Sequence, residues 1–237
     1  MNLIKNKKKK INMKYEITEE YKEINDIKVF RIKALKDFGG VKKGDTGGWI
    51  EKETNLSQEG NCWVFDNAQV FNDSRVFGNA WIDNNVRISG NSRIFEDAYV
   101  GGNANVSDEA WIRGNAVING NTLIMGEAGI SGNTRIRGNV CIAGKARICG
   151  EARIMGDAQV CGDYWIKNPL FIVGTKDSIT HCAKNKIAIG CEIQSIEYWK
   201  NNYKEMGEKY CYSDGEIKEY YEYILLCEKA NKRIFGE

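Results

Sequence analysis

The sequence predicts a mainly β protein whose centre is a single-stranded parallel β-helix of about six coils. Three observations lead to this prediction. Val or Ile recurs every six residues, without a gap, at 18 consecutive positions from Val64 to Ile166. Gly, Asn or Asp stands two residues after each of them, with Glu96 as the exception. Within the repeat a small residue stands four residues after each one, with Tyr164 as the exception.

The six-residue period explains this shape. Six is a multiple of two, the side-chain period of a β-strand, so every aliphatic side chain can point into one interior. A helix face repeats near 3.6 residues and would lose this phase. Gly, Asn and Asp tolerate the positive φ of a tight corner. Each buried Val or Ile contributes about 1.5–3 kcal/mol, so the interior holds the coils together once the ends are capped.

The segment before the repeat divides into two parts. Residues 1–13 contain the run "KNKKKK" and are expected to be a disordered basic tail. Residues 14–60 are expected to form a small β-rich lead-in that caps the first coil. Within it "KVFRIKAL" (28–35) predicts a strand, and "GDTGGWIEKETNLSQEGNCWVF" (44–65) leads into the repeat.

The repeat is expected to span residues 61–167, with Pro169 ending it, and residues 168–237 are expected to form an α+β cap with two helices. "PLFIVG" and "KIAIGCEI" indicate strands. Apolar residues from Ile196 to Tyr210 follow alternating steps of three and four, which predicts an amphipathic helix. Ser213 and Glu216 have the spacing of a capping box ahead of a last helix over 214–233.

Composition excludes several classes of protein. The eight cysteines contain no CxxC pair, which argues against a metal cluster or a disulfide framework and favours reduced cytoplasmic thiols. No apolar run approaches the ~18 residues of a membrane span. The net charge is +2, and it becomes −3 without the five lysines of residues 1–12, so nucleic acid is not the expected partner.

The motifs resemble a known family. The lead-in "GDTGGWIEKETNLSQEGNCWV", the GNA-type hexads and a tail with "IGCEIQSIEYWKNNYKEMG" are similar to the YdcK-like hexapeptide-repeat proteins of bacteria, prophages and phages. The resemblance covers nearly all of the chain from Met13. It implies a left-handed β-helix of the trimeric LpxA-like type, with three hexads in each triangular coil. It brings no established catalytic residues to this sequence.

The resemblance also raises two kinds of chemistry. Related carbonic anhydrases hold zinc with three histidines, and this chain has one, His181, so no metal site is expected. Related acyltransferases use acetyl-CoA and generally a histidine base in a cleft between subunits. The repeat contains no histidine and no extruded loop. His181 in the tail is the only candidate base, and an ordinary structural histidine is the favoured interpretation.

The outward positions of the repeat provide the candidate ligand-binding residues. Residues 18 apart should lie above one another, which gives three vertical columns on the outer surface. The first column contains Trp63, Trp81, Tyr99, Arg135 and Arg153, and the third contains Arg75, Arg93, Trp111 and Arg147, followed by Trp165, with Phe77 and Phe95 beside it. Arginine beside aromatic rings suits a nucleotide or another anionic ring compound. Simple side-chain stacking and a subunit interface are together the favoured interpretation of such columns, and the ligand cleft is the alternative that the arginines support.

Three functions therefore remain open. The first is a non-catalytic, cytoplasmic homotrimer that holds a small anionic ligand between subunits and needs no cofactor. In the phage setting that the resemblance implies, such a protein could sequester a nucleotide immune signal. The second is an acyltransferase that uses acetyl-CoA. The third is a structural or assembly module.

Overall fold

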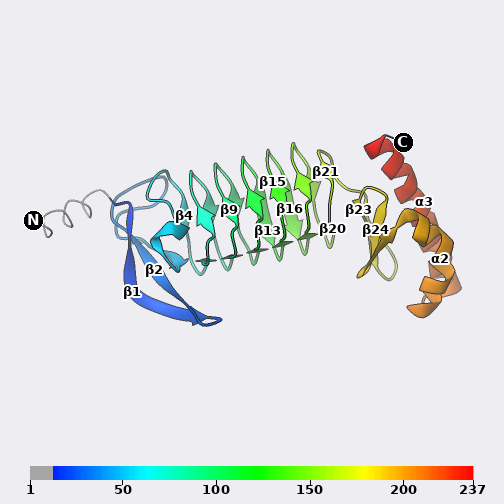
Figure 1. Cartoon of the computed structure of the whole chain (residues 1–237), viewed down its shortest axis with the longest axis horizontal. Helices are drawn as coiled ribbons and strands as arrows, with labels where there is room; N and C mark the ends of the chain where they lie inside the picture. The colour runs from blue at the N-terminus through cyan, green and yellow to red at the C-terminus, as the bar shows by residue number, and fades with distance from the viewer. Residues whose placement is uncertain (1–12, 237) are drawn as a thin grey trace, which may run out of the picture.

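The computed structural model describes residues 13–236 and shows an elongated molecule in three parts (Figure 1). A β-hairpin lies at the N-terminal end, a stack of about six coils forms the middle, and a small sheet with two helices lies at the C-terminal end. The predicted basic tail is residues 1–13, and residues 1–12 of it lie outside the described part of the chain. The mainly β fold with its parallel β-helix is confirmed, whereas the left hand of the winding stays an expectation from the resemblance.

The coils form three parallel sheets, here called faces 1, 2 and 3. Face 1 consists of β4 (Trp63–Val64), β7 (Trp81–Ile82), β10 (Tyr99–Val100), β13 (Val117–Gly120), β16 (Arg135–Gly138) and β19 (Arg153–Ile154). Face 2 consists of β5 (Gln69–Val70), β8 (Arg87–Ile88), β11 (Asn105–Val106), β14 (Leu123–Ile124), β17 (Cys141–Ile142) and β20 (Gln159–Val160). Face 3 consists of β6 (Arg75–Val76), β9 (Arg93–Ile94), β12 (Trp111–Ile112), β15 (Gly129–Ile130), β18 (Arg147–Ile148) and β21 (Tyr164–Trp165).

The repeat positions fill the interior as predicted. Val100 pairs with Ile118 and Ile112 with Ile130, so each aliphatic side chain sits directly above its equivalent 18 residues away. The aliphatic positions from Val64 to Val160 are all buried, together with the small residues between them. Because the side chains stack in register, one continuous apolar column supports all three faces.

The corners adopt the positive φ that the sequence predicts. The second residue after each aliphatic position, from Asp66 to Gly156, lies in this region. Glu96, the exception to the sequence rule, does so as well, at φ 59°. Its carboxylate accepts a hydrogen bond of 2.8 Å from the Gly114 N–H of the next coil, which offsets part of the strain. Where glycine occupies a corner the space is tight, since a Cβ on Gly102 would lie 2.7 Å from the Gly120 nitrogen.

The last hexad departs from the predicted register. The sequence places Ile166 inside and Trp165 outside, but Arg147 pairs with Tyr164 and Ile148 with Trp165. Trp165 is 1% exposed and Ile166 is 57% exposed. The last corner lies at Asp163, φ 63°, one residue away from the expected Gly162. The shift brings the large indole into the tube, where it covers the open end and packs edge-on against Phe235.

The N-terminal lead-in extends face 2. β1 (Tyr15–Ile24) and β2 (Ile27–Ala34) form an antiparallel hairpin, and β3 (Thr46–Ile50) joins the hairpin to β5. A short 3₁₀ turn, η1 (Glu53–Asn55), then leads into the first coil. The predicted strand over 28–35 corresponds to β2, whereas the sequence did not indicate β1 as a separate strand.

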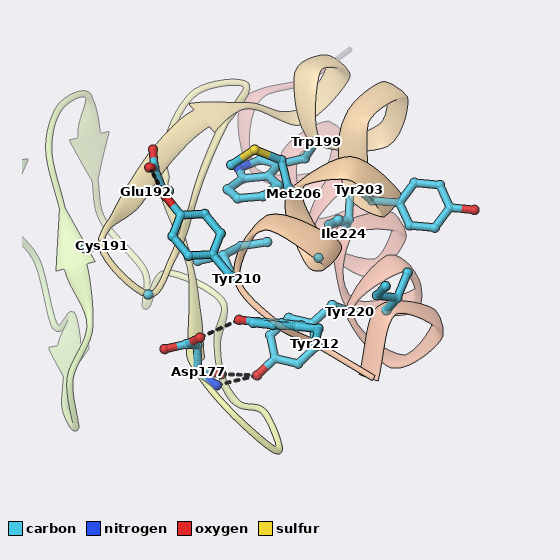
Figure 2. Close-up of a pocket in the computed structure, with 14 residues that line it drawn as sticks. Asp177, Cys191, Glu192, Trp199, Tyr203, Met206, Tyr210, Tyr212, Tyr220 and Ile224 are labelled. Carbon is cyan, nitrogen blue, oxygen red and sulfur yellow. Dashed lines mark hydrogen bonds between the residues drawn. The ribbon is translucent and has the colours of Figure 1, made fainter. Parts of the chain in front are cut away.

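The C-terminal part is a four-stranded antiparallel sheet followed by two helices. The strands are β22 (Phe171–Val173), β23 (Ser178–Ala183), β24 (Lys186–Ile189) and β25 (Glu192–Ser195), and the helices are α2 (Ile196–Lys209) and α3 (Asp214–Phe235). The capping box of α3 is present, because Ser213 Oγ accepts from the Glu216 N–H and the Glu216 carboxylate accepts from the Ser213 N–H. The helices and the sheet enclose a second apolar core, one side of which is drawn in Figure 2.

Candidate ligand-binding face

Face 3 brings four of the predicted residues into one column. Arg75 pairs with Arg93, Arg93 with Trp111, and Trp111 with Gly129, which in turn pairs with Arg147. Neighbouring strands in such a sheet lie about 4.8 Å apart, so these side chains form a continuous outer row. The predicted third column is therefore correct as far as Arg147, and Tyr164 takes the place expected for Trp165.

A depression of about 500 Å³ lies over the first three strands of this row. Its lining residues are Asp73, Arg75, Asn91, Arg93, Phe95, Glu109 and Trp111. Two guanidinium groups, one indole, one phenyl ring and two carboxylates therefore face the same space. Such a combination offers both stacking and hydrogen bonding to a polar ring compound.

The two arginines of the depression have no partner of opposite charge within 4 Å. Arg75 and Arg93 are exposed, and neither guanidinium group donates a hydrogen bond or forms an ion pair within residues 13–236. Asp73 is instead paired with Lys52 at 2.9 Å. That hydrogen bond holds the pKa of the Asp73 carboxyl below its ordinary value. Because Lys52 offsets the charge of Asp73, the guanidinium groups remain available to an anion.

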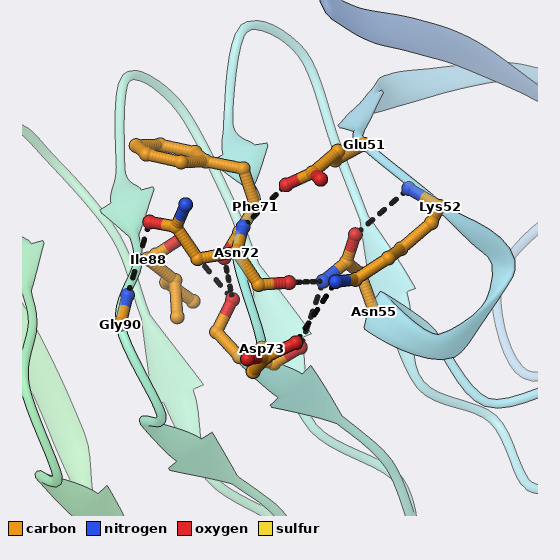
Figure 3. Close-up of polar contacts among 9 residues, drawn as sticks. Glu51, Lys52, Asn55, Phe71, Asn72, Asp73, Ile88 and Gly90 are labelled. Carbon is orange, nitrogen blue, oxygen red and sulfur yellow. Dashed lines mark hydrogen bonds and ion pairs between the residues drawn. The ribbon is translucent and has the colours of Figure 1, made fainter. Parts of the chain in front are cut away.

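The wall of the depression is fixed by polar contacts with the lead-in (Figure 3). Asn55 Nδ2 donates to the carbonyl oxygens of Asn72, at 3.0 Å, and Ser74, at 2.9 Å. The Glu51 carboxylate accepts from the Asn72 N–H at 2.6 Å. Buried polar contacts of this kind hold the corner that carries Asp73 in one position.

Trp111 and Arg147 form a separate contact at the far end of the depression. The Arg147 guanidinium lies 5.5 Å from the centre of the Trp111 ring. Gly129 makes this approach possible, because a Cβ there would lie 2.3 Å from the indole. Arg147 also donates to the Glu127 carbonyl. Arg147 therefore holds the indole in place and does not line the depression.

Phe77 and Phe95 stack on each other at the side of face 3. Their ring centres are 4.8 Å apart and their planes differ by 5°. Phe95 lines the depression, whereas Phe77 does not. The stacked pair forms an apolar edge that continues toward the neighbouring corner.

The first-column residues lie on a different face and do not join this site within one chain. Trp63 is buried, 1% exposed, under Tyr15 and Phe38, so it is not the outward ring that the sequence predicted. The lead-in covers the first coil, which a repeat pattern cannot indicate. Trp81 packs on Phe65 but stays 38% exposed, and the Tyr99 hydroxyl donates to Asp83 at 3.1 Å.

The two first-column arginines extend face 1 beyond the aromatic rings. Arg135 pairs with Arg153, and both side chains are exposed. Neither guanidinium group makes a hydrogen bond or ion pair in the described part of the chain. Face 1 thus carries rings over its first coils and free guanidinium groups over its last.

His181 lies in the interior at the junction between the β-helix and the cap. It is buried between Trp165 and Phe235, and its Nε2 lies 3.0 Å from Asn231 Oδ1. Burial lowers the pKa of the imidazole, so the neutral form is favoured. A substrate on the surface cannot reach this ring, which is consistent with a structural histidine.

Comparison with known proteins identifies the type of repeat. No family model matches the chain. Over 67 residues the chain is 40% identical to "Uncharacterized acetyltransferase YdcK" of Escherichia coli (strain K12). The match and the parallel β-helix together fit a YdcK-like hexapeptide-repeat protein. The matched segment covers 24% of this chain and 21% of the relative, so the chain spans about a fifth of the curated relative's length.

In this hexapeptide-repeat chain, sequence reasoning missed part of the depression. Asp73, Asn91 and Glu109 line it, and each stands three residues after an inward aliphatic position. The predicted outer columns contain only the positions directly before and directly after the aliphatic residues. The positions three residues after the aliphatic ones also form columns, because they too are 18 residues apart. A column of these positions contains Asp73, Asn91 and Glu109.

The structure shows neither a metal site nor a membrane-spanning helix among the described residues. Among residues 13–236, no group of three or more His, Cys, Asp or Glu side chains is arranged to hold a metal ion. Within the same range, neither the length nor the hydropathy of any helix suits a membrane span.

Proposed function

We propose that this protein binds a small anionic ring compound in the depression of face 3 and has no catalytic role there. The observation that supports the proposal is the placement of two unpaired guanidinium groups, Arg75 and Arg93, next to the indole of Trp111. A guanidinium group binds phosphate or carboxylate through two parallel hydrogen bonds. The indole offers a flat apolar surface for a planar ring.

The acidic residues of the depression refine the ligand class. Asp73 and Glu109 can accept hydrogen bonds from amino or hydroxyl groups of the ligand. A phosphate that contacts the arginines, a base that stacks on Trp111 and a sugar or amino group near Glu109 together describe a nucleotide. In a phage or prophage setting the corresponding role is sequestration of a nucleotide signal.

A homotrimer is part of this proposal, because the depression is shallow and open on one chain. Hexapeptide-repeat β-helices commonly form trimers. If face 1 of a neighbouring subunit covered face 3, its Trp81, Tyr99, Arg135 and Arg153 would supply a second wall. The predicted columns of both faces would then meet across a subunit boundary.

Binding can be tested with nucleoside monophosphates and the corresponding nucleosides. Differential scanning fluorimetry and calorimetry should show binding of a monophosphate that is weakened at least about tenfold in Arg93→Ala. Arg87→Ala is the matched control, because Arg87 occupies the same place in the repeat on face 2. Equal loss in both variants, or equal affinity for nucleoside and monophosphate, would contradict the proposed site.

Acetyl transfer is the second candidate, favoured by the name of the similar protein, an uncharacterized acetyltransferase. The base predicted for it, His181, is buried, so transfer would need a different proton acceptor. Incubation with acetyl-CoA and a panel of small amines, followed by detection of free thiol, tests this function directly. Thiol release well above the spontaneous rate would favour the transferase, and the absence of both turnover and nucleotide binding would favour a structural module.

A further inference from the structure

The C-terminal cap contains a cavity that is separate from the candidate face. It lies between α2, the beginning of α3 and the turn from β24 to β25, and its volume is about 130 Å³. Sites for drug-sized ligands usually measure about 300–1,000 Å³, so this cavity suits a compact ligand. Figure 2 shows the side chains around it.

The floor of the cavity is apolar and its mouth is aromatic. Trp199, Met206 and Ile224 are buried below it. Tyr210 and Tyr212 are more exposed and lie near the opening, close to Cys191 (Figure 2). A ligand that enters would therefore pass between tyrosine rings before it reaches the apolar floor.

The charged groups that line the cavity are both acidic. They are Asp177 and Glu192, and no Lys or Arg lines the cavity. The Tyr212 hydroxyl donates to the Asp177 carboxylate, and the Tyr210 hydroxyl donates to the Glu192 carboxylate. These hydrogen bonds orient the rings and leave the negative charge of each carboxylate at the mouth.

The tyrosines remain neutral rings in this setting. Burial, followed by the contact with Asp177, raises the pKa of Tyr212. The hydrogen bond to Glu192 raises the pKa of Tyr210. Neutral phenol rings have electron-rich faces that attract cations.

The same two rings already bind cations of the chain. Lys176 Nζ lies 4.6 Å from the centre of the Tyr212 ring, and Lys209 Nζ lies 4.8 Å from that of Tyr210. Neither lysine lines the cavity. Lys209 also lies 3.9 Å from Glu192 and offsets part of its charge. Asp177 forms no ion pair within residues 13–236, so it is the less compensated carboxylate.

From this geometry we propose that the cavity binds a compact organic cation, an alkylammonium group with a small apolar body. The aromatic mouth and the two carboxylates stabilise the positive charge, and the floor formed by Trp199, Met206 and Ile224 takes the apolar part. An anion would meet two carboxylates here, so this ligand class differs from the one proposed for face 3.

Choline and its neutral analogue 3,3-dimethyl-1-butanol test the proposal, because they have nearly the same shape and differ in charge. Calorimetry on the full chain should show choline binding at least about tenfold more tightly than the alcohol. Equal affinity for the two compounds would overturn the proposal, and so would the absence of choline binding.

Three variants locate the interaction in the cavity. Tyr210→Leu removes a ring and should weaken choline binding roughly fivefold or more, whereas Tyr210→Phe keeps the ring and should bind within about twofold of the parent. Glu228→Gln is the control, because Glu228 pairs with Lys200 and does not line the cavity. If Tyr210→Leu lowers the melting temperature, its weaker choline binding could reflect poorer folding. Tyr210→Phe then tests the proposal, because it keeps the aromatic ring, and loss of choline binding in this variant would contradict a role for the ring. Unchanged choline binding in a folded Tyr210→Leu protein would overturn the assignment.

Discussion

The two ends of the β-helix are closed by side chains of different kinds, mainly donors at the N-terminal end and acceptors at the C-terminal end. At the corners the N–H of one coil donates to a carbonyl of the next, as from Asn67 to Asn84 at 3.0 Å and from Asn85 to Gly102 at 2.9 Å. At these positions the first coil lacks donors for its carbonyl oxygens, and the last coil lacks acceptors for its N–H groups. Both kinds of group are costly to bury without a partner.

The N-terminal end is closed mainly by side-chain donors, and the Glu51 carboxylate also accepts from the Asn72 N–H. The Lys14 ammonium group, 1% exposed, donates to the carbonyl oxygens of Cys62 at 2.9 Å, Glu59 at 3.3 Å and Gly60 at 3.4 Å. The Tyr15 hydroxyl donates to the Leu56 carbonyl at 2.6 Å. These donors occupy the place of the N–H groups that a preceding coil would have supplied.

The C-terminal end is closed by acceptors. The Arg153 N–H donates to Asn168 Oδ1 at 2.6 Å, and the Gln159 N–H donates to Thr180 Oγ1 at 3.2 Å. The Cys182 carbonyl on β23 accepts from the Cys161 N–H at 3.0 Å. At each end, side chains from outside the repeat pair with backbone groups that no further coil reaches, and the added segments cover the edges against further strand addition.

The largest effect is expected at the N-terminal end. Lys14→Met keeps much of the side-chain volume but removes a donor shared by three carbonyls, and we expect a loss of about 3–4 kcal/mol in the free energy of unfolding. Urea denaturation followed by circular dichroism measures it. Lys33→Met, at an exposed position of β2, is the control and should change stability by less than about 0.5 kcal/mol. A loss at Lys14 as small as at Lys33 would contradict the closing role of the ammonium group.

A smaller effect is expected from one acceptor at the other end. Thr180→Val is close in shape and removes the oxygen that accepts from Gln159, which should cost about 1–2 kcal/mol. Thr54→Val, at an exposed position, serves as the control and should be nearly neutral in the same denaturation experiment. If both variants behaved alike, the Thr180 hydroxyl would not be needed to close the last coil.

Lowering the pH should reduce the stability of the C-terminal end, because His181 is buried there. Burial lowers the pKa of this imidazole below 6.5, so below pH 6.5 the unfolded chain binds a proton that the folded chain does not. Stability contributed by the neutral ring is therefore lost as pH falls from 6.5 toward the lowered pKa, by up to about 1.4 kcal/mol per pH unit. Unfolding experiments between pH 7.5 and 5 on the parent and on His181→Gln measure it. An equally steep decline in His181→Gln would place the acid sensitivity elsewhere.

The smallest effect is expected in the middle of the stack. Asn103 Nδ2 donates to Asn121 Oδ1 at 2.9 Å, and Asn103 Oδ1 accepts from Asn85 at 3.1 Å, in an exposed ladder along one edge. Water can replace these bonds, so Asn103→Ala should cost no more than about 0.5–1 kcal/mol. Thermal unfolding measures it, and a loss comparable to that of Lys14→Met would remove the distinction between ends and middle.

The candidate face was predictable in part. The 18-residue spacing predicts that Arg75, Arg93 and Trp111 lie in one column, and the structure confirms that column. Asp73, Asn91 and Glu109 follow the same spacing and were overlooked. Trp63 occupies an outward position of the repeat but is buried, because residues far from it in the sequence fold over the first coil.

The sequence by itself determined the body of this protein, because a six-residue period is local information that repeats at every coil. It settled which side chains point inward, where the corners turn and which outward residues lie above one another. Only the tertiary structure decided how the tube ends: Lys14 contacts residues more than 40 positions away, His181 meets Asn231 50 positions away, and Trp165 replaces Ile166 in the interior. These contacts join segments that no period relates, so they depend on how the complete chain packs.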